Sequence, residues 1–213
     1  MVSIIITTYN YAQYVERAIR SALDQTIDNE QYEIIVVNDC STDETTEVLQ
    51  NYESEVRIFN LEKNLGLAGA RNFGIKKAKG QFVIFLDADD YIHKELIRLQ
   101  KIFLEENNTL DAVSVDYYLV DERGKHLKHV NAQENPIACG IMFRKDFLYN
   151  IGLYDEGFRA REEEDLRIRW VDKYNIYNII LPLYRYRMHD SNLTKNLDEM
   201  DKHRELLQNK HNK

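Results

Sequence analysis

The first half of the chain alternates short apolar runs with helical patterns, and no other feature of the sequence constrains the fold as strongly. Four of the runs are expected to form strands: Val2–Ile6, Ile34–Val37, Val56–Phe59 and Phe82–Leu86. The continuous β-branched run Val2–Ile6 is typical of a strand buried on both faces. Strands separated by helices form βαβ units with right-handed crossovers. The sequence therefore predicts an α/β fold with a mostly parallel, Rossmann-like central sheet flanked by helices.

Helices are predicted between and after these runs. Apolar residues over 14–23 follow helical spacing, and Ser41 with Glu44 fits a capping box that opens a second helix. A third helix is expected over 67–78, where Gly80 follows its end. The apolar face of a fourth is expected to consist of Ile92, Leu96, Leu99 and Phe103.

The second half of the chain is less regular and predicts a mixed sheet. Gly124 can supply the positive φ of a hairpin turn over 120–126. The chain is polar from about Thr194, which predicts a weakly held helix or a frayed tail. The other elements expected here are strands at Ala112–Tyr118, Ile141–Arg144, Ile176–Ile180 and Tyr184–Met188, and a helix at Glu164–Tyr174.

Composition and charge argue against some classes of partner and site. The chain of 213 residues has 28 Lys and Arg against 36 Asp and Glu, a formal charge of −8, so nucleic acid is not an expected partner. Cys40 and Cys139 lie in no CxxC pair, and two reduced thiols are expected. No apolar run approaches the roughly 18 residues of a membrane span, and no signal peptide is visible. We expect a cytoplasmic protein, with association at the inner face of a membrane left open.

Polar clusters follow three of the predicted strands at the points where those strands end. They lie at 8–10, 38–43 and 87–90. In an open parallel sheet the ligand crevice lies beyond the carboxyl ends of the strands. The three clusters are therefore predicted to meet at one edge of the sheet, around a ligand.

The acidic cluster that follows Phe82–Leu86 carries the strongest chemical signal. Asp87 and Asp89 are two residues apart in an extended segment, so both can face one ligand. Two such carboxylates repel each other unless a cation lies between them, and Mg²⁺ or Mn²⁺ commonly binds one or two carboxylates together with substrate phosphates. The alternative is a solvated strand end in which Asp90 is a helix N-cap.

Two further candidates come from the ends of other strands. Asp39 lies where an acidic residue often accepts a hydrogen bond from a ribose or a base, or else precedes a helix for structural reasons. Arg71 lies in a Gly-rich segment over 64–74 that leads into a helix, where it could reach an anion or be an ordinary surface residue. No GxGxxG follows the first strand and no P-loop motif occurs, which disfavours dinucleotide and P-loop sites.

Four consecutive acids over 162–165 begin the predicted helix of the second half. Acids favour the first turn of a helix, but four exceed what capping requires, and crowding raises the pKa of at least one of them. A carboxylate of this kind suits a general base near neutral pH. His189 follows a strand that carries Arg185 and Arg187, which makes it a candidate for phosphate or metal contact.

Together these residues resemble the family 2 glycosyltransferases of the GT-A fold. The resemblance covers residues 2 to about 194, nearly the whole chain. Six motifs occur in the family's order: IIITTYN at 4–10, VNDCSTD at 37–43, NLGLAGARN at 64–72, FLDADD at 85–90, the acidic run at 162–165 and YRMH at 186–189.

The resemblance implies roles for individual residues on the donor side. Thr8 and Tyr9 would contact the nucleotide, and Asp39 would hydrogen-bond the uracil or the ribose. Arg71 would hold the base or a phosphate.

The same resemblance assigns the metal. Asp87-Ala88-Asp89 would be the family's DxD motif, with Asp87 near the ribose or donor sugar and Asp89 binding the metal, Mn²⁺ or Mg²⁺. His189 would face the metal or the pyrophosphate.

The family's acidic pair, which contains the catalytic base, can be placed by counting back from the helix it precedes. Leu166 and Arg169 put the pair at Glu162-Glu163, which makes Glu163 the expected base. The literal Glu-Asp pair of the family occurs at Glu164-Asp165, so both of these residues remain catalytic candidates.

The implied activity is an inverting transfer of a sugar from a nucleotide-diphosphate donor, expected to be a UDP-sugar, to an acceptor hydroxyl. The acceptor would be a glycan or a lipid-linked molecule in bacterial-type surface glycan or polysaccharide synthesis. A single domain over 1–194 is expected, with a nucleotide-binding half at 1–110 and an acceptor-side half at 111–194, followed by a polar tail at 195–213.

Three alternatives remain at this stage. A metal-dependent nucleotidyltransferase would share the carboxylates, but its triphosphate loop has no good counterpart at 7–10. A nucleotide-sugar-binding protein without catalysis would keep Asp39 and Asp87–Asp89 and lose the base. A fragment of a larger membrane-associated synthase would be expected to contain apolar helices.

Overall fold

The computed structural model describes residues 1–171, 173–190, 192 and 197–211. Within these residues nine strands form one sheet in the order β3-β2-β1-β4-β8-β6-β9-β5, with β7 paired to β6. The first four positions of this order are parallel strands, and the remainder of the sheet is mixed. The predicted α/β class with a mixed second half is confirmed.

The parallel part of the sheet comes from the four apolar runs of the first half. β1 (Val2–Thr8) lies between β2 (Tyr32–Asn38) and β4 (Phe82–Asp87), and β3 (Arg57–Asn60) pairs with β2 at the edge. Thr8 lies opposite Asn38, and Thr7 lies opposite Asp87. The carboxyl ends of β1, β2 and β4 are therefore level with one another, and the polar residues after them reach the same edge.

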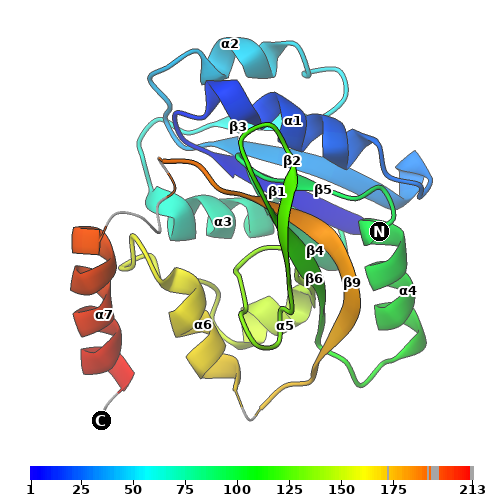
Figure 1. Ribbon diagram of the computed structural model, residues 1–213, viewed down its shortest axis with the longest axis vertical. Coiled ribbons are helices and arrows are strands. Elements are labelled where there is room, and N and C mark those ends of the chain that lie inside the picture. Colours follow the sequence, from blue (N-terminus) through cyan, green and yellow to red (C-terminus); the bar gives the residue numbers. More distant parts are fainter. Residues whose placement is uncertain (172, 191, 193–196, 212–213) are drawn as a thin grey trace.

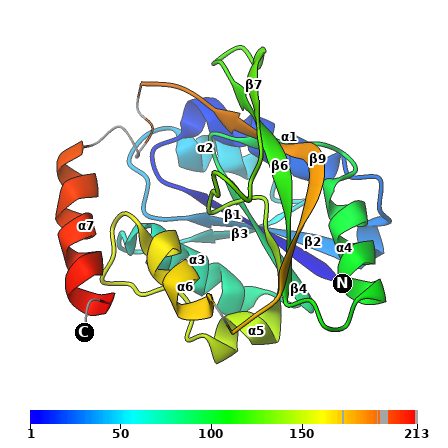
Figure 2. The same cartoon turned by 60° about the horizontal axis from the view of Figure 1, so that its bottom comes forward.

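Helices cover both faces of this parallel sheet. α1 (Ala12–Leu23) and α2 (Thr45–Gln50) lie on one face, and α3 (Gly66–Lys77) lies on the other (Figures 1 and 2). The strand order explains this arrangement, because the crossovers on either side of β1 run in opposite directions and each is right-handed. α4 (Leu96–Glu106) then packs against β6.

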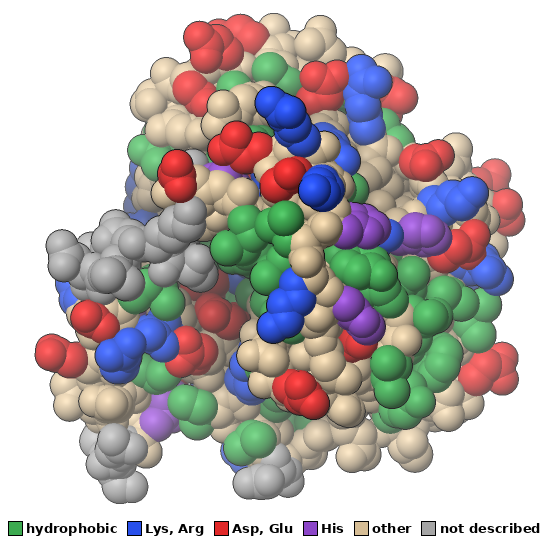
Figure 3. All heavy atoms as spheres, viewed as in Figure 1, with side chains coloured by type: hydrophobic (Ala, Val, Ile, Leu, Met, Phe, Trp, Pro, Cys, Tyr) green, Lys and Arg blue, Asp and Glu red, His purple; other side chains and the backbone are tan. Residues whose placement is uncertain are grey.

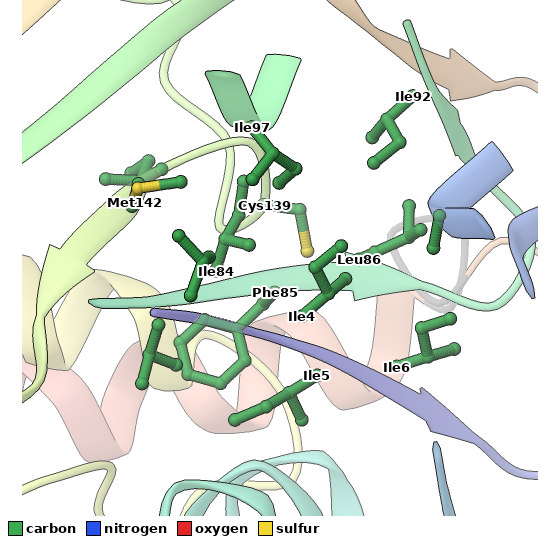
Figure 4. Packing of buried hydrophobic residues seen from close by; sticks show 14 of the residues in the cluster. Ile4, Ile5, Ile6, Ile84, Phe85, Leu86, Ile92, Ile97, Cys139 and Met142 are labelled. Atoms are coloured by element: carbon green, nitrogen blue, oxygen red, sulfur yellow. The ribbon is translucent and has the colours of Figure 1, made fainter. Parts of the chain in front are cut away.

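The core lies on both faces of β1 and β4. Figure 4 shows Ile84, Ile97 and Met142 on one side of β4 and Phe85 with Ile5 on the other. All five side chains are at most 1% exposed. The continuous apolar runs follow from this, because successive side chains of a strand point to opposite faces and both faces are covered here.

The second half of the chain completes the sheet. β6 (Ala112–Val120) pairs with β9 in parallel and with β8 (Met142–Arg144) in antiparallel. β5 (Tyr91–Ile92) lies at the edge next to β9. β7 (His126–Val130) forms the predicted hairpin with β6, and the φ of +86° at Gly124 confirms the role expected of that glycine. Two short helices follow, α5 (Lys145–Asn150) and α6 (Glu162–Trp170).

Two predicted strands at Ile176–Ile180 and Tyr184–Met188 are a single strand, β9 (Ile176–Arg187). The break between them contains Pro182 and coincides with two shifts in register, since Val115 pairs with Ile179, Asp116 with Pro182 and Tyr117 with Tyr184. Residues 180, 181 and 183 of β9 thus bulge out of the ladder. A bulge of this kind accommodates a proline without ending the strand.

The predicted capping box does not form. α2 begins at Thr45 rather than just after Ser41, and its N-cap makes no side-chain hydrogen bond. The Ser41 hydroxyl instead accepts from the backbone N–H of Asn10 (2.9 Å). It thereby ties the loop after β2 to the loop after β1, a long-range contact that a local sequence pattern does not contain.

The last described segment, α7 (Leu197–His211), packs beside α6 (Figures 1 and 2). The predicted boundary at 194 lies in 193–196, outside the described residues. None of the described helices combines the length and the apolar composition that a membrane span requires. Cys40 and Cys139 are free thiols, and acidic and basic side chains are interspersed on the face seen in Figure 3.

Candidate active site

A cavity of about 630 Å³ opens at the carboxyl ends of β1, β2 and β4. We call it the first cavity. This is the edge at which the polar strand ends were predicted to meet, and that prediction is confirmed. Most of the predicted site residues line it, namely Thr8, Tyr9, Asp39, Arg71, Asp87, Asp89 and Glu163.

Asp39 and Thr8 lie side by side at one end of the first cavity. The Asp39 carboxylate accepts hydrogen bonds from the backbone N–H groups of Leu65 (2.7 Å) and Gly66 (2.8 Å), where α3 begins. Burial raises the pKa of Asp39. Each carboxylate oxygen can accept a second hydrogen bond, so the group remains available to a ligand.

The Thr8 side chain offers a further hydrogen-bonding position to a ligand. Its hydroxyl oxygen is buried and has no hydrogen-bond partner among the residues described. Because buried polar atoms are almost always paired, an atom of this kind in a cavity wall favours a ligand contact. Tyr9 is exposed beside it on the cavity wall, with 45% of its surface accessible.

Arg71 is fully buried and joins two acidic groups from different parts of the chain. Its Nη1 donates to Glu162 Oε1 (2.7 Å), and its Nη2 donates to Asp87 Oδ1 (2.9 Å). The guanidinium thus fixes the end of β4 relative to the start of α6. Contact with a base or a phosphate, the role expected of Arg71 from the sequence, stays a prediction.

Asp89 lines the first cavity, and His189, which is not among the lining residues, contacts its carboxylate. His189 Nε2 lies 2.8 Å from Asp89 Oδ2, and the imidazole is almost completely buried. Asn192 Nδ2 lies 3.4 Å from the same oxygen. Burial and the nearby Asp87 carboxylate raise the pKa of Asp89. The family resemblance predicted that these two residues share one metal ion, and the structure brings their side chains into direct contact.

The donor set of Asp89 and His189 fits a divalent cation that takes its remaining ligands from a substrate. Mn²⁺ and Mg²⁺ accept carboxylate oxygen, and Mn²⁺ also accepts imidazole nitrogen. Within the described ranges no group of three or more His, Cys, Asp or Glu side chains is arranged to hold a metal ion without such help. This is typical of Mg²⁺ sites, in which the protein supplies one or two carboxylates and the phosphates of the substrate supply further ligands.

Asp90 lies in the turn between β4 and β5 and hydrogen-bonds to the sheet, rather than acting as a helix N-cap. Its carboxylate accepts from the Tyr184 hydroxyl (2.7 Å) and from the backbone N–H of Arg187 (2.8 Å), both on β9. Arg187 in turn donates to the carbonyl of Asp89 (2.6 Å). These contacts anchor the turn after β4 to the far half of the sheet, and they position Asp89 for a ligand.

The four acids at the start of α6 point in different directions. Glu162 and Glu163 line the first cavity. Glu164 pairs with Arg161 (2.5 Å), and the Asp165 carboxylate is buried against Arg169 (2.9 Å) and residues of α7. Of the three catalytic candidates, only Glu163 reaches the first cavity.

The two glutamates of the cavity differ from ordinary surface carboxylates in their acidity. Burial raises the pKa of Glu162 to about 7, against the opposing effect of Arg71. Burial also raises the pKa of Glu163, and the Glu164 carboxylate adds to that rise. A carboxylate with a raised pKa is a stronger base once it is ionised, which suits proton abstraction near neutral pH.

Sequence reasoning placed Glu162 in the acidic pair but missed its contact with Arg71. The residue is 2% exposed and contacts Arg71, which is 91 positions earlier in the chain. Its position next to Glu163 was the only available signal, because no local pattern reports a long-range ion pair. Cys139, which lies within 3.5 Å of Arg71 Nη2, was likewise not expected at the cavity wall.

Residues 3–168 match the sequence model of a family described as Glycosyl transferase family 2. The chain is also 34% identical over 206 residues to an uncharacterized glycosyltransferase of Rickettsia bellii. That alignment covers 91% of this chain and 29% of the relative. The chain thus spans about a third of the length of the first Rickettsia relatives it matches.

A further relative has a named activity. The poly(ribitol-phosphate) beta-N-acetylglucosaminyltransferase TarS of Staphylococcus aureus is 35% identical over 125 residues, which cover 57% of this chain and 22% of TarS. The crystal structure of TarS residues 1–349 in complex with UDP-GlcNAc has a TM-score of 0.77 at 24% identity, and covers 92% of this chain and 60% of that one.

A similar fold occurs in the mannosyltransferase PcManGT of Pyrobaculum calidifontis, solved in complex with GDP-Man and Mn²⁺. Its TM-score is 0.76 at 17% identity, over 98% of this chain and 63% of that chain. The likeness to both solved structures confirms the GT-A type fold that the motifs implied.

Proposed function

This chain belongs to glycosyl transferase family 2, and we propose that it transfers a sugar from a nucleotide-diphosphate donor to an acceptor hydroxyl with inversion of configuration. One observation carries the proposal. The first cavity brings a pair of carboxylates at the end of β4 and a glutamate of raised pKa on α6 to the same ligand space. These are the groups that a departing diphosphate and an attacking hydroxyl respectively require.

On the donor side, we assign the nucleoside to Thr8, Tyr9 and Asp39. The open hydrogen-bonding position on Thr8 Oγ1 and the acceptor capacity of Asp39 support this assignment. The solved TarS complexes contain UDP and UDP-GlcNAc, which favours a UDP-sugar as the donor here. Asp87, held by Arg71, would lie near the ribose or the donor sugar.

Asp89 and His189 would hold the divalent cation, Mn²⁺ or Mg²⁺. The complex of PcManGT with Mn²⁺ supports this choice of ion. When bound, the cation supplies positive charge that neutralises the diphosphate leaving group. Asp89 is kept in place by the anchoring of its own carbonyl to Arg187.

On the acceptor side, Glu163 takes the proton of the attacking hydroxyl. Attack from the face opposite the leaving group is a single displacement and inverts the anomeric carbon, through an oxocarbenium-like transition state. Glu162 cannot serve in the same way while Arg71 holds its carboxylate (2.7 Å).

The acceptor is proposed to be a glycan or a lipid-linked precursor in bacterial surface glycan synthesis, since TarS is named for such a polymer. The cytoplasmic location, and contact with the inner face of a membrane, stay predictions from the sequence. The division of residues 1–194 into a donor half and an acceptor half is likewise part of the proposal.

The proposal is tested by measuring thermal unfolding with UDP in the presence and absence of Mn²⁺. A ligand at 100 times its Kd stabilises the folded state by about 2.7 kcal/mol, which corresponds to roughly 5–10 °C for a chain of this size. We expect this rise with UDP only when Mn²⁺ is present. Asp89→Asn should abolish the metal-dependent part of the rise.

The control variant is Asp28→Asn, which changes an exposed aspartate that does not line the first cavity. It should respond to UDP as the wild-type protein does. A rise with UTP alone and none with UDP would favour a nucleotidyltransferase. An Asp89→Asn variant with the full Mn²⁺-dependent response would refute the metal assignment.

A further inference from the structure

A second cavity, of about 300 Å³, adjoins the first. It lies between α6 and the strands β6 and β9, and its lining includes Trp170, Ile176 and Asn178. Pro136, Ile137 and Cys139 line both cavities. The two spaces are therefore separated by a single stretch of chain, and the donor site assigned above does not use the second one.

The second cavity contains a cation that no carboxylate of the described residues contacts directly, although Glu163 and Glu164 act on it at longer range. Arg167 lines it, and its guanidinium makes no hydrogen bond or ion pair with any residue in the described part of the chain. The other arginine of α6 is paired, Arg169 with Asp165 (2.9 Å), and so is Arg161 just before the helix, with Glu164 (2.5 Å). Burial lowers the pKa of Arg167, but an arginine side chain keeps its proton at neutral pH.

The guanidinium of Arg167 is partly buried, and its nitrogens remain open to a ligand. Taking a charge out of water is unfavourable, and the cost is recovered when an opposite charge with hydrogen-bond acceptors lies against it. Carboxylates and phosphates match the planar donors of arginine in a bidentate manner. The chemistry of the second cavity therefore selects an anionic oxygen group.

Arg167 is also placed correctly relative to the proposed base. Glu163 and Arg167 are four residues apart on α6, so they lie on the same helix face, one turn apart. Four residues of helix rise about 6 Å, which is the span of a few bonds of a polyol or a sugar ring. A molecule held at Arg167 by its anionic end can reach Glu163 with a hydroxyl.

We propose that the acceptor of this protein carries a phosphate or carboxylate group, and that this group binds Arg167 in the second cavity while a neighbouring hydroxyl reaches Glu163. The inference rests on the proposed function and extends it to the chemical class of the acceptor. Trp170 and Ile176 supply apolar walls for the carbon skeleton between the two groups.

The single tryptophan of the chain makes this testable without knowledge of the natural acceptor. Trp170 is the only tryptophan of the sequence and lines the second cavity, so a ligand bound there changes the surroundings of the one tryptophan fluorophore. Protein saturated with UDP and Mg²⁺, which occupies the first cavity, is titrated with glycerol 3-phosphate, with glucuronate and with uncharged glycerol. We expect a saturable change in emission with at least one anion and none with glycerol.

The variants identify the group responsible. Arg167→Gln should weaken the anion titration by about tenfold or more, because a charged hydrogen-bond pair is lost. Arg167→Lys should retain part of it. Arg98→Gln, which removes an exposed arginine of α4 that pairs with Glu95, should leave it unchanged. The anion with the stronger response identifies the acceptor as phosphate-bearing or carboxylate-bearing.

Two results would overturn the inference. One is an Arg167→Gln variant that titrates like the wild-type protein, and the other is an equal response to glycerol and to both anions. Failure of UDP to bind would instead count against the proposed function. It would leave the present inference testable, because the anions can also be titrated against Trp170 emission without UDP. The two proposals thus fail on different measurements.

Discussion

Glu163 and Glu164 are neighbours in the sequence, yet only Glu163 lines the first cavity. The difference arises from the helix, because adjacent residues project about 100° apart, and Arg161 holds the Glu164 carboxylate outside the cavity (2.5 Å). The sequence alone left the base among three acids. Of the three, only Glu163 lines the first cavity, and for this reason we propose it as the base.

Replacement of Glu163 by Gln should reduce turnover with a UDP-sugar by about 10²–10⁴-fold, the usual contribution of a general base. The affinity for UDP should not change, because the base contacts the acceptor. Steady-state kinetics together with calorimetric titration of UDP separates the two effects. Glu164→Gln is the matched control and should retain activity within tenfold. Loss of activity in Glu164→Gln and not in Glu163→Gln would move the base to residue 164.

The acidity of Glu163 has a consequence for the pH dependence of catalysis. A base must be deprotonated, and burial raises the pKa of Glu163, so the acid limb of kcat/KM should lie above the ordinary glutamate range. The Glu164 carboxylate contributes to the rise. Glu164→Gln should therefore move this limb to lower pH, whereas the exposed Glu47→Gln should not. An unchanged limb in Glu164→Gln would show that another group titrates.

At the scale of single elements, α3 packs unusually closely on β1. A Cβ built on Gly74 would lie 2.5 Å from Ile5 Cγ2, well inside van der Waals contact. This close approach places the N-terminus of α3 next to Asp39 and carries Arg71 into the interior. A glycine near the middle of a helix is ordinarily a weak point, and here the contact with the strand explains it.

Gly74→Ala should therefore destabilise the protein by about 1–3 kcal/mol, the usual cost of overpacking. Helix propensity alone would give the opposite sign, a gain of about 1 kcal/mol. Urea denaturation midpoints measure the difference. Lys76→Ala, an exposed position on the same helix, should change the midpoint little. A stabilised Gly74→Ala would mean that α3 can move away from β1.

The helices and strands that were predicted correctly are those that local sequence signals determine. The four strands of the first half and the hairpin glycine Gly124 were predicted correctly, because short apolar runs and a required positive φ are local properties. The prediction of two strands in place of β9 was wrong, because a shift in register opposite Asp116, on another strand, accommodates Pro182. The capping box failed for the same reason, since Ser41 is used by Asn10.

The site follows the same division. The strand-end positions of Asp39, Asp87 and Asp89 follow from the topology of a parallel sheet. The pairing of Arg71 with Glu162 does not, because 91 residues separate the two and only the packed molecule brings them together. The second cavity was not predicted either, since Arg167 is recognisable as unpaired only when its surroundings are known.

At the scale of the whole molecule, the C-terminal helix is attached to the active-site helix through Asp165. The buried carboxylate contacts Lys210 (2.5 Å) and His211 (2.8 Å) on α7 as well as Arg169. The most C-terminal part of the described chain thus supports the helix that carries Glu163. This explains why Asp165, which the sequence offered as a catalytic residue, is directed away from the first cavity.

Asp165→Asn should lower the free energy of unfolding at pH 7 by about 3 kcal/mol, because a buried charge cluster loses its anion. For a chain of this length that is roughly 6–12 °C in Tm. Asp155→Asn, which removes only a partly exposed partner of Lys210, is the control and should cost less than about 1 kcal/mol. Equal effects of the two changes would contradict the anchoring role.

The effect of Asp165→Asn should also depend on pH. Burial opposes ionisation, but the hydrogen bonds from Lys210 and His211 hold the pKa of Asp165 below its usual value. A lowered folded-state pKa contributes stability above the unfolded pKa, near 4, that is lost as the pH falls through the folded value. The difference in Tm between wild type and variant should shrink below about pH 4.

The sharing of Arg71 between Asp87 and Glu162 limits how such a protein can be recombined with its relatives. A chimera that takes the first hundred residues from one homologue and the remainder from another divides this triad across its junction. If the incoming segment lacks an acid at the position of Glu162, the buried guanidinium of Arg71 keeps only one of its two carboxylate partners. The two segments should therefore exchange well only between parent proteins that have the same residues at these three positions.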